Sequence, residues 1–293
     1  MIVSIALPSN ASLFEKTRFV QLANGANLGV FVSDLPQNHD LFQLLSVWKT
    51  RFPTLPNLGT AIISPFVYEG EFLLKQITTL FETFEDGIEL GFGIGDKKLL
   101  NKSIKNRVES FQISLREILG NETIEKSKNI CSIAGSGEKL LNFANEMELG
   151  LIYNGIIDRN TLTLLKNKKT RENVSSYIMA DINEYQNLSA GFVSIVSRII
   201  TGLSTKELAR LSIQKTVVDT INEQLSKRNI SEYEKWLPED VVRKVAIIGS
   251  NKELVEQLEK LSSMNIKQVI LSIVGSNNKV EFLNYMSKEQ VQL

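Results

Sequence analysis

Two carboxylates follow short apolar runs, at points where a side chain could reach a substrate. Asp34 comes directly after one such run, and Asp96 follows Gly93 and Gly95 at the end of another. A carboxylate behind a buried strand can contact a polar substrate, and it can transfer a proton if its pKa rises. Asp34 is therefore the first candidate for a catalytic residue and Asp96 the second. The alternative for Asp34 is that it only caps a turn.

The chain has one histidine, His39, and one cysteine, Cys131. A Ser-His-Asp triad with a spare histidine, a zinc site built on several histidines, an intramolecular disulfide and a cysteine-rich metal site are therefore disfavoured, and we expect no metal. His39 and Asp40 are expected to open a helix rather than to act on a substrate.

Glycine and serine cluster where a phosphate or a flat ring could approach the backbone. The loop Ala134, Gly135, Ser136 and Gly137 lies between an apolar run and a helical stretch. Free N–H groups at a helix N-terminus bind phosphate, although a plain turn with Ser136 as N-cap fits the same pattern. Alternate glycines, which include Gly93 and Gly95, also admit close approach but lack the dinucleotide fingerprint.

The elements that must position these residues alternate between short buried runs and longer amphipathic stretches. Eight runs read as strands buried on both faces, at 3–7, 28–32, 58–63, 88–92, 129–134, 150–153, 175–180 and 268–273. Helical periodicity occupies 13–23, 41–49, 71–84, 99–119, 138–146 and 159–168. Eight β-α units favour a single (β/α)8 TIM barrel domain over residues 1–293, with a doubly wound open sheet as the alternative.

The spacing of the strands is uneven. Between the seventh and eighth runs lie helical stretches at 183–200, 205–227 and 252–264, with a short apolar run at 245–248 before the last. We expect a helical insertion, about residues 183–264, that packs on the barrel.

Charge and hydropathy limit the partners. Lys plus Arg and Asp plus Glu are 33 each, so the formal net charge is zero, which disfavours a nucleic-acid partner. No apolar run approaches the ~20 residues that span a bilayer, and the N-terminus has no convincing export signal. We expect a cytoplasmic protein that does not bind membranes.

Taken in order, these segments resemble the bacterial luciferase-like flavin-monooxygenase superfamily. They are most similar to its deazaflavin branch, typified by methylenetetrahydromethanopterin reductase. The matching pieces include 7–10, 30–34, 58–66, 90–97, 134–137 and 248–254, so that the resemblance covers most of the chain.

This resemblance implies a cofactor ring over the barrel mouth, against the second to fourth strands, where Gly93 and Gly95 lie. It implies a bulge with a non-proline cis peptide at Ala61–Ile62, and a phosphate held by the loop from Ala134 to Gly137. The cofactor would be coenzyme F420, with FMN as the alternative. Members commonly form homodimers through helices beside strands two to four.

The chain departs from the family pattern in the pocket. Ala6 stands where the first strand often ends in Glu, and Leu35 where His usually follows Asp. Three functions therefore stay open. The first is a coenzyme F420-dependent oxidoreductase that transfers hydride to or from a small or pterin-like substrate. The second is an FMN-dependent monooxygenase, and the third is a cofactor-binding relative that has lost catalysis.

Overall fold

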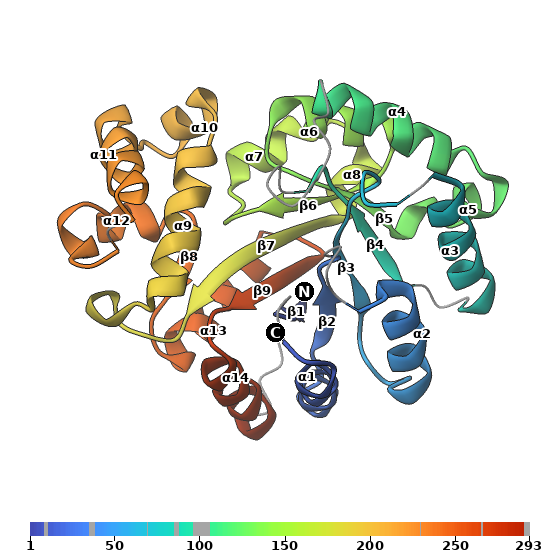
Figure 1. Cartoon of the computed structure of the whole chain (residues 1–293), viewed down its shortest axis with the longest axis horizontal. Coiled ribbons are helices and arrows are strands. Elements are labelled where there is room, and N and C mark those ends of the chain that lie inside the picture. Colours follow the sequence, from blue (N-terminus) through green and yellow to red (C-terminus); the bar gives the residue numbers. More distant parts are fainter. Residues whose placement is uncertain are drawn as a thin grey trace.

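Parallel strands and helices alternate along the chain in a computed structural model that describes residues 1–8, 11–34, 39–68, 70–84, 88–95, 106–228, 230–264 and 266–289 (Figure 1). The barrel strands are β1 (Ile2–Ala6), β2 (Gly29–Val32), β3 (Leu58–Ile63), β4 (Glu89–Phe92), β5 (Cys131–Ala134), β6 (Gly150–Asn154), β7 (Val174–Asp181) and β9 (Gln268–Ile273). Each strand from β1 to β7 pairs with the next, β7 pairs with β9, and β9 pairs with β1. The eight-stranded barrel is therefore confirmed, and the open sheet is wrong.

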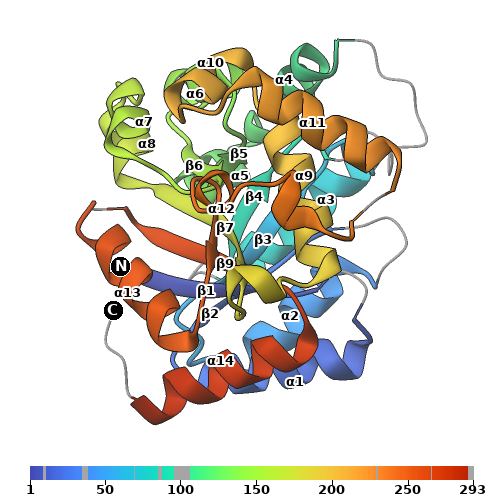
Figure 2. The ribbon, with the colours of Figure 1, turned by 90° about the vertical axis from the view of Figure 1, so that its left-hand side faces the viewer.

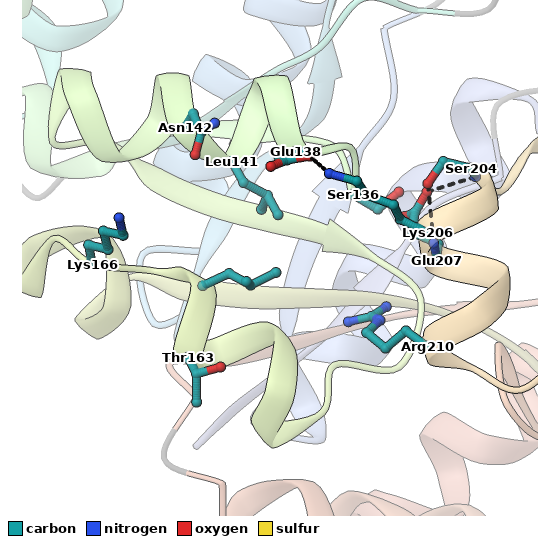
Figure 3. A pocket seen from close by; sticks show the side chains of 11 residues that line it. Ser136, Glu138, Leu141, Asn142, Thr163, Lys166, Ser204, Lys206, Glu207 and Arg210 are labelled. Atoms are coloured by element: carbon teal, nitrogen blue, oxygen red, sulfur yellow. Dashed lines mark hydrogen bonds and ion pairs between the residues drawn. The ribbon is translucent and has the colours of Figure 1, made fainter.

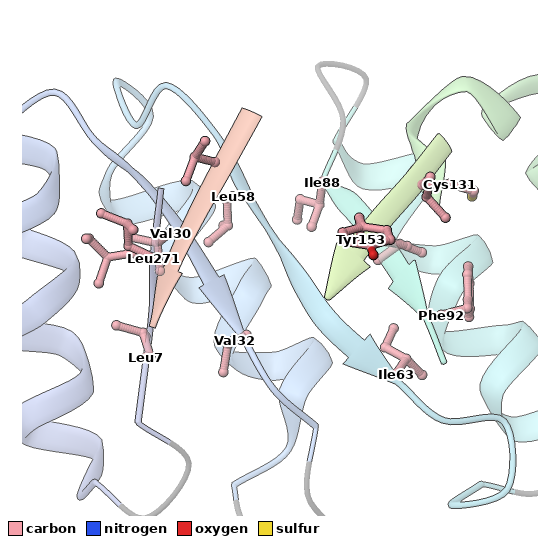
Figure 4. Packing of buried hydrophobic residues seen from close by; sticks show 14 of the residues in the cluster. Leu7, Val30, Val32, Leu58, Ile63, Ile88, Phe92, Cys131, Tyr153 and Leu271 are labelled. Atoms are coloured by element: carbon pink, nitrogen blue, oxygen red, sulfur yellow. The ribbon is translucent and has the colours of Figure 1, made fainter. Parts of the chain in front are cut away.

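The strands are apolar because they are covered on both sides. On the outer side, side chains such as Val30, Leu58 and Leu90 join the large core beneath the helices (Figure 4). On the inner side a small cluster fills the barrel, and it consists of Ala6, Phe31, Ala61, Ile152 and Ile270. This double burial explains the nearly continuous hydrophobic runs from which the strands were predicted.

The helices that follow the first six strands cover the barrel. They are α1 (Leu13–Gly25), α2 (Leu41–Arg51), α3 (Gly70–Thr83), α4 (Arg107–Leu119), α5 (Glu122–Lys126), α6 (Glu138–Met147), α7 (Arg159–Leu164) and α8 (Lys168–Glu172). Several begin with side-chain caps that could be expected from the sequence: Ser12 caps α1 in a capping box, and Asp40 caps α2. The stretch predicted as one helix at 159–168 is two helices, because Leu165 adopts an extended conformation and Asn167 caps α8.

The segment between β7 and β9 packs its own apolar cluster to one side of the barrel (Figure 1). It contains α9 (Ala190–Gly202), α10 (Thr205–Arg210), α11 (Lys215–Ser226), α12 (Glu239–Val242), β8 (Ala246–Ile248) and α13 (Asn251–Ser262). The predicted helix at 205–227 is broken at Ser212, whose φ is 53°. The short run at 245–248 was expected within a helical insertion, but it forms an additional strand, β8, whose Ala246 pairs with Met179 of β7.

The C-terminal helix α14 (Ser276–Glu289) follows β9 and was not predicted. It lies beside α1, as the turned view in Figure 2 also shows. Among the described residues, no helix is long and apolar enough to cross a membrane.

Candidate functional site

The third strand carries an irregularity where it meets the second and fourth strands. The register of β3 against β4 shifts between Ala61 and Ile63, and the Ala61–Ile62 peptide is cis. Both features were expected from the resemblance, and both are confirmed. The end of β2 holds this bulge: the Ser33 hydroxyl donates to the Ala61 carbonyl at 2.7 Å, and the Asp34 N–H donates to the Ile62 carbonyl at 3.1 Å.

Gly93 packs directly against the bulge. Its N–H donates to the Ile63 carbonyl at 3.0 Å, and a Cβ on Gly93 would lie 2.4 Å from Cδ1 of Ile62. Gly95 has a φ of 77°, and its carbonyl accepts from Arg107 at 3.2 Å. These two glycines therefore let the chain after β4 approach β3, while their contact with a cofactor stays a prediction.

The glycines deeper in the barrel have a different explanation. A Cβ on Gly59 would lie 2.7 Å from the Phe31 ring, and a Cβ on Gly91 would lie 2.4 Å from Ile152. These positions are small because the inner side chains of the barrel fill the space. They leave no room there for a ligand.

Asp34 lies at the end of β2 with one carboxylate oxygen buried. Its Oδ2 has no hydrogen-bond partner among the described residues. Burial raises the pKa of Asp34 to about 6, although the neighbouring Tyr68 hydroxyl lowers the pKa and offsets part of that rise. Burial and the nearby Asp34 in turn raise the pKa of Tyr68, whose ring makes an edge contact with Phe42. A carboxyl group in this state can exchange a proton near neutral pH.

The other candidates near this carboxylate are placed differently. His39 is exposed, and Asp40 is the N-cap of α2, where its side chain accepts the N–H of Gln43 at 2.9 Å. Asp40 therefore begins the helix, as was expected for these two residues. Asp96 lies outside the described residues. Tyr68 was not predicted, because a single tyrosine after a turn carries no distinctive spacing.

A cavity of about 400 Å³ opens at the carboxyl ends of β1, β2, β7 and β9. Pro8, Ser33, Tyr177, Ser272 and Lys279 are among its lining residues. Since Ser33 also holds the bulge, the cavity and the bulge share one wall. Lys279 of α14 was not predicted as a site residue.

The glycine loop after β5 borders a second cavity, of about 480 Å³ (Figure 3). Gly137, not Ser136, is the N-cap of α6, and no side chain caps this helix. Ala134 and Gly135 are half-buried, and the Gly135 N–H donates to the Ile152 carbonyl at 3.0 Å. The first N–H groups of α6 therefore lack the usual side-chain acceptor, which suits an anion.

The walls of this second cavity carry both signs of charge. Lys206 pairs with Glu138, and Arg210 pairs with Asp158 at 3.3 Å. Burial raises the pKa of Glu207, but hydrogen bonds from Ser136 and Ser204 outweigh it, so that the pKa is lowered. Glu207 Oε1 and Arg210 Nε are buried without hydrogen-bond partners among the described residues. These cations and carboxylates come from α6, from the N-cap of α7 and from the segment after β7, and no local sequence pattern indicates that they meet.

The structure thus groups the candidates in two places. Ser33, Asp34, Ala61, Ile62 and Gly93 lie together at the ends of neighbouring strands, whereas the loop from Ala134 to Gly137 borders the second cavity through Ser136. Within the described part of the chain, no three His, Cys, Asp or Glu side chains are grouped to hold a metal ion.

Solved structures share this architecture over the whole chain. A coenzyme F420-dependent tetrahydromethanopterin reductase from Methanopyrus kandleri matches with a TM-score of 0.77 at 16% identity, and 99% of each chain is covered. A coenzyme F420-dependent secondary alcohol dehydrogenase matches at 0.65 with 12% identity and 98% of each chain covered.

An FMN-bound protein is also similar. The oxygenating constituent of 3,6-diketocamphane monooxygenase from Pseudomonas putida matches with a TM-score of 0.59 at 11% identity, over 99% of this chain and 97% of that one. No protein-family model matches the sequence. The chain therefore has the luciferase-like monooxygenase fold, as the resemblance implies.

Proposed function

We propose that this protein is a coenzyme F420-dependent oxidoreductase that acts on a small or pterin-like organic substrate. The observation that carries the proposal is the bulge of β3, which Ser33 and the Asp34 N–H hold beside a cavity at the carboxyl end of the barrel. Enzyme sites in barrels of this kind lie at that end. The similar reductase and alcohol dehydrogenase, both named as F420-dependent, support the choice of cofactor.

The residues present fit such a cofactor in two respects. Asp34 offers a buried oxygen without a partner, and α6 offers an N-terminus without a side-chain cap. We infer that the ring lies against Ala61 and Ile62, and that the N–H groups behind Gly137 hold the phosphate. The negative charges of Glu207 and Glu138 repel an anion in that cavity. The backbone N–H groups and Arg210 therefore have to bind the phosphate strongly enough to overcome this repulsion.

The small number of reactive side chains indicates that the cofactor carries out the redox step and that the protein binds and orients the reactants. The reduced deazaflavin, when bound, supplies the hydride, as cofactors do the difficult chemistry in most redox enzymes. Asp34 is the polar group that we expect nearest to the substrate. With its pKa at about 6, it can hold or release one proton there, and the bulge keeps it in position.

Titration of the protein with coenzyme F420, followed by deazaflavin fluorescence, tests the proposal. We expect micromolar affinity in the wild type and at least tenfold weaker binding in Gly137→Asp, which places a negative charge at the phosphate site. A Cβ at this position meets nothing within 4 Å, so the substitution does not disturb packing.

Gly137→Ala is the matched control, because it adds a Cβ without a charge or a hydrogen-bonding group, and that Cβ meets nothing within 4 Å. It should bind coenzyme F420 nearly as the wild type does. Undisturbed deazaflavin fluorescence in the wild type, together with tight FMN binding, would replace the proposal with the FMN-dependent alternative. Cofactor binding without turnover on any substrate would support the relative that has lost catalysis.

A further inference from the structure

Lys279 is a buried cation at the mouth of the barrel. It belongs to the first turn of α14, and only 2% of its surface is exposed. Its Nζ donates to the carbonyl of Ala6, the last residue of β1, at 2.8 Å. The Nζ also lies 5.4 Å from the centre of the Phe19 ring of α1, and α1 and α14 lie side by side in Figure 2.

No carboxylate among the described residues balances this charge. In the part of the chain that the structure describes, Lys279 takes part in no ion pair. Burial lowers its pKa to about 7, and no neighbouring charge counters that effect. A buried ammonium group without a counter-ion is unfavourable, because a single carbonyl replaces only part of its hydration. Lys279 is therefore a buried cation that lacks a counter-ion among the described residues.

The space beside Lys279 is suited to supply that partner. The cavity of about 400 Å³ has Lys279 in its wall, together with the hydroxyl-bearing Ser33, Ser272 and Ser276. No carboxylate is among the described residues that line it. Ser276 is also the first residue of α14, so a helix N-terminus adds partial positive charge at the same place. Ammonium, hydroxyls and helix N-terminus together favour an anion.

We propose that this cavity binds a carboxylate group of the organic substrate, with Lys279 as its counter-ion and serine hydroxyls as donors. The inference rests on the proposed function only in identifying the ligand as the substrate. A carboxylate here would be next to Ser33, and through Ser33 next to the bulge against which we place the cofactor ring. The site would thus orient one end of the substrate.

The test uses butyrate as the probe and butyramide as its uncharged analogue, in calorimetric titrations of the full chain without cofactor. We expect the wild type to bind butyrate at least tenfold more tightly than butyramide at pH 6. Lys279→Met, which keeps an unbranched side chain of nearly the same length without the charge, should lose this preference. Lys288→Met removes an exposed lysine from the same helix and should keep it. Equal binding of the two probes by the wild type would overturn the proposal, even if Lys279→Met does not fold.

A second titration distinguishes the source of the carboxylate. With coenzyme F420 at saturation, butyrate should bind unchanged, and Lys279→Met should bind the cofactor as the wild type does. Competition between butyrate and the cofactor would assign the site to acidic groups of the cofactor and overturn the substrate assignment. Butyrate binding that depends on Lys279, in a protein that binds no coenzyme F420, would overturn the proposed function and leave the carboxylate site supported.

Discussion

The hydroxyl of Ser33 donates a hydrogen bond of 2.7 Å to the carbonyl of Ala61, which ties the end of the second strand to the bulge of the third. The next residue, Asp34, makes the same kind of contact through its N–H, to the carbonyl of Ile62 at 3.1 Å. Two consecutive residues directly after β2 thus hold two consecutive carbonyls of β3. Ser33 also lines the cavity, and Asp34 supplies the buried carboxyl group, so the same pair of hydrogen bonds supports the cavity wall and the reactive group.

Ser33→Ala should loosen this wall. The loss of one hydrogen bond to a half-buried carbonyl should lower the free energy of unfolding by about 1 kcal/mol. It should also weaken coenzyme F420 binding severalfold, because the bulge is no longer held. Denaturant unfolding and fluorescence titration measure the two effects.

Ser46→Ala is the matched control for Ser33→Ala. The Ser46 hydroxyl donates to the Phe42 carbonyl at 2.9 Å within α2, away from the barrel mouth. It should leave cofactor affinity unchanged. Equal effects of the two substitutions on affinity would show that the contact of Ser33 with Ala61 has no special role.

Gly93→Ala should displace Ile62, since the new Cβ would lie 2.4 Å from Cδ1 and 3.3 Å from Cγ2 of that side chain. We expect a loss of about 1–3 kcal/mol in the free energy of unfolding, which is typical of overpacking, and weaker cofactor binding. Gly25→Ala at the end of α1 adds a Cβ that meets nothing within 4 Å. The control should gain up to about 1 kcal/mol from helix propensity. Similar stability changes in the two variants would contradict the close approach of Gly93 to the bulge.

Asp34→Asn should change how stability depends on pH. The native pKa of Asp34 is about 6, above its ordinary value of 3.8, so between these pH values the folded protein binds more protons than the unfolded chain. The free energy of unfolding of the wild type therefore falls as pH rises through this window. Asp34→Asn removes that fall, and above pH 6 it should be the more stable form, by about 1–3 kcal/mol.

Urea unfolding at pH 4 and pH 7.5 measures this difference for Asp34→Asn. Asp219→Asn changes an exposed aspartate of α11 and should show no such pH dependence. A gain for Asp34→Asn that is the same at both pH values would mean that its carboxyl group titrates normally.

Most of the barrel could be predicted because buried parallel strands carry an unbroken hydrophobic signal. The runs at 58–63 and 268–273 match β3 and β9 to the residue. The short β8 could not be predicted, because three apolar residues acquire a strand conformation only by pairing with the part of β7 that extends beyond its pairing with β6. The break at Ser212 depends on a left-handed residue that is neither glycine nor asparagine, so it left no sign in the sequence.

The site could be predicted only where residues adjoin a strand. Asp34 was expected because it directly follows a buried strand, and Ala61 and Ile62 were expected from the family resemblance. For the loop after β5, the alternative with Ser136 as N-cap is wrong, because Gly137 is the N-cap of α6. Lys279 lies in a polar stretch that reads as solvent-exposed, and its burial depends on how α14 packs against α1 and the end of β1. Such long-range packing leaves no local pattern.

Lys279→Met should stabilise the protein most at low pH. The native pKa of Lys279 is about 7, against an ordinary value of 10.5, so below pH 7 the folded protein carries the unfavourable buried charge. Between these values only the unfolded chain binds the proton, and the free energy of unfolding of the wild type rises with pH. The gain for Lys279→Met should be about 1–4 kcal/mol at pH 6 and should shrink towards pH 9.5.

Ionisable groups near Lys279 do not produce the same pH dependence of the stability gain for Lys279→Met. Ionisable residues on adjoining elements include Lys16 of α1, whose pKa burial lowers, Tyr177 of β7, whose pKa burial raises, and Asp181, which accepts from Asn278 at 3.3 Å. All three remain in the variant, and the hydrogen bond to Ala6 is lost at every pH. Denaturant unfolding at pH 6 and pH 9.5 therefore isolates Lys279, with Lys288→Met as the control. A gain that stays constant between the two pH values would show that Lys279 is not a buried cation awaiting an anionic ligand.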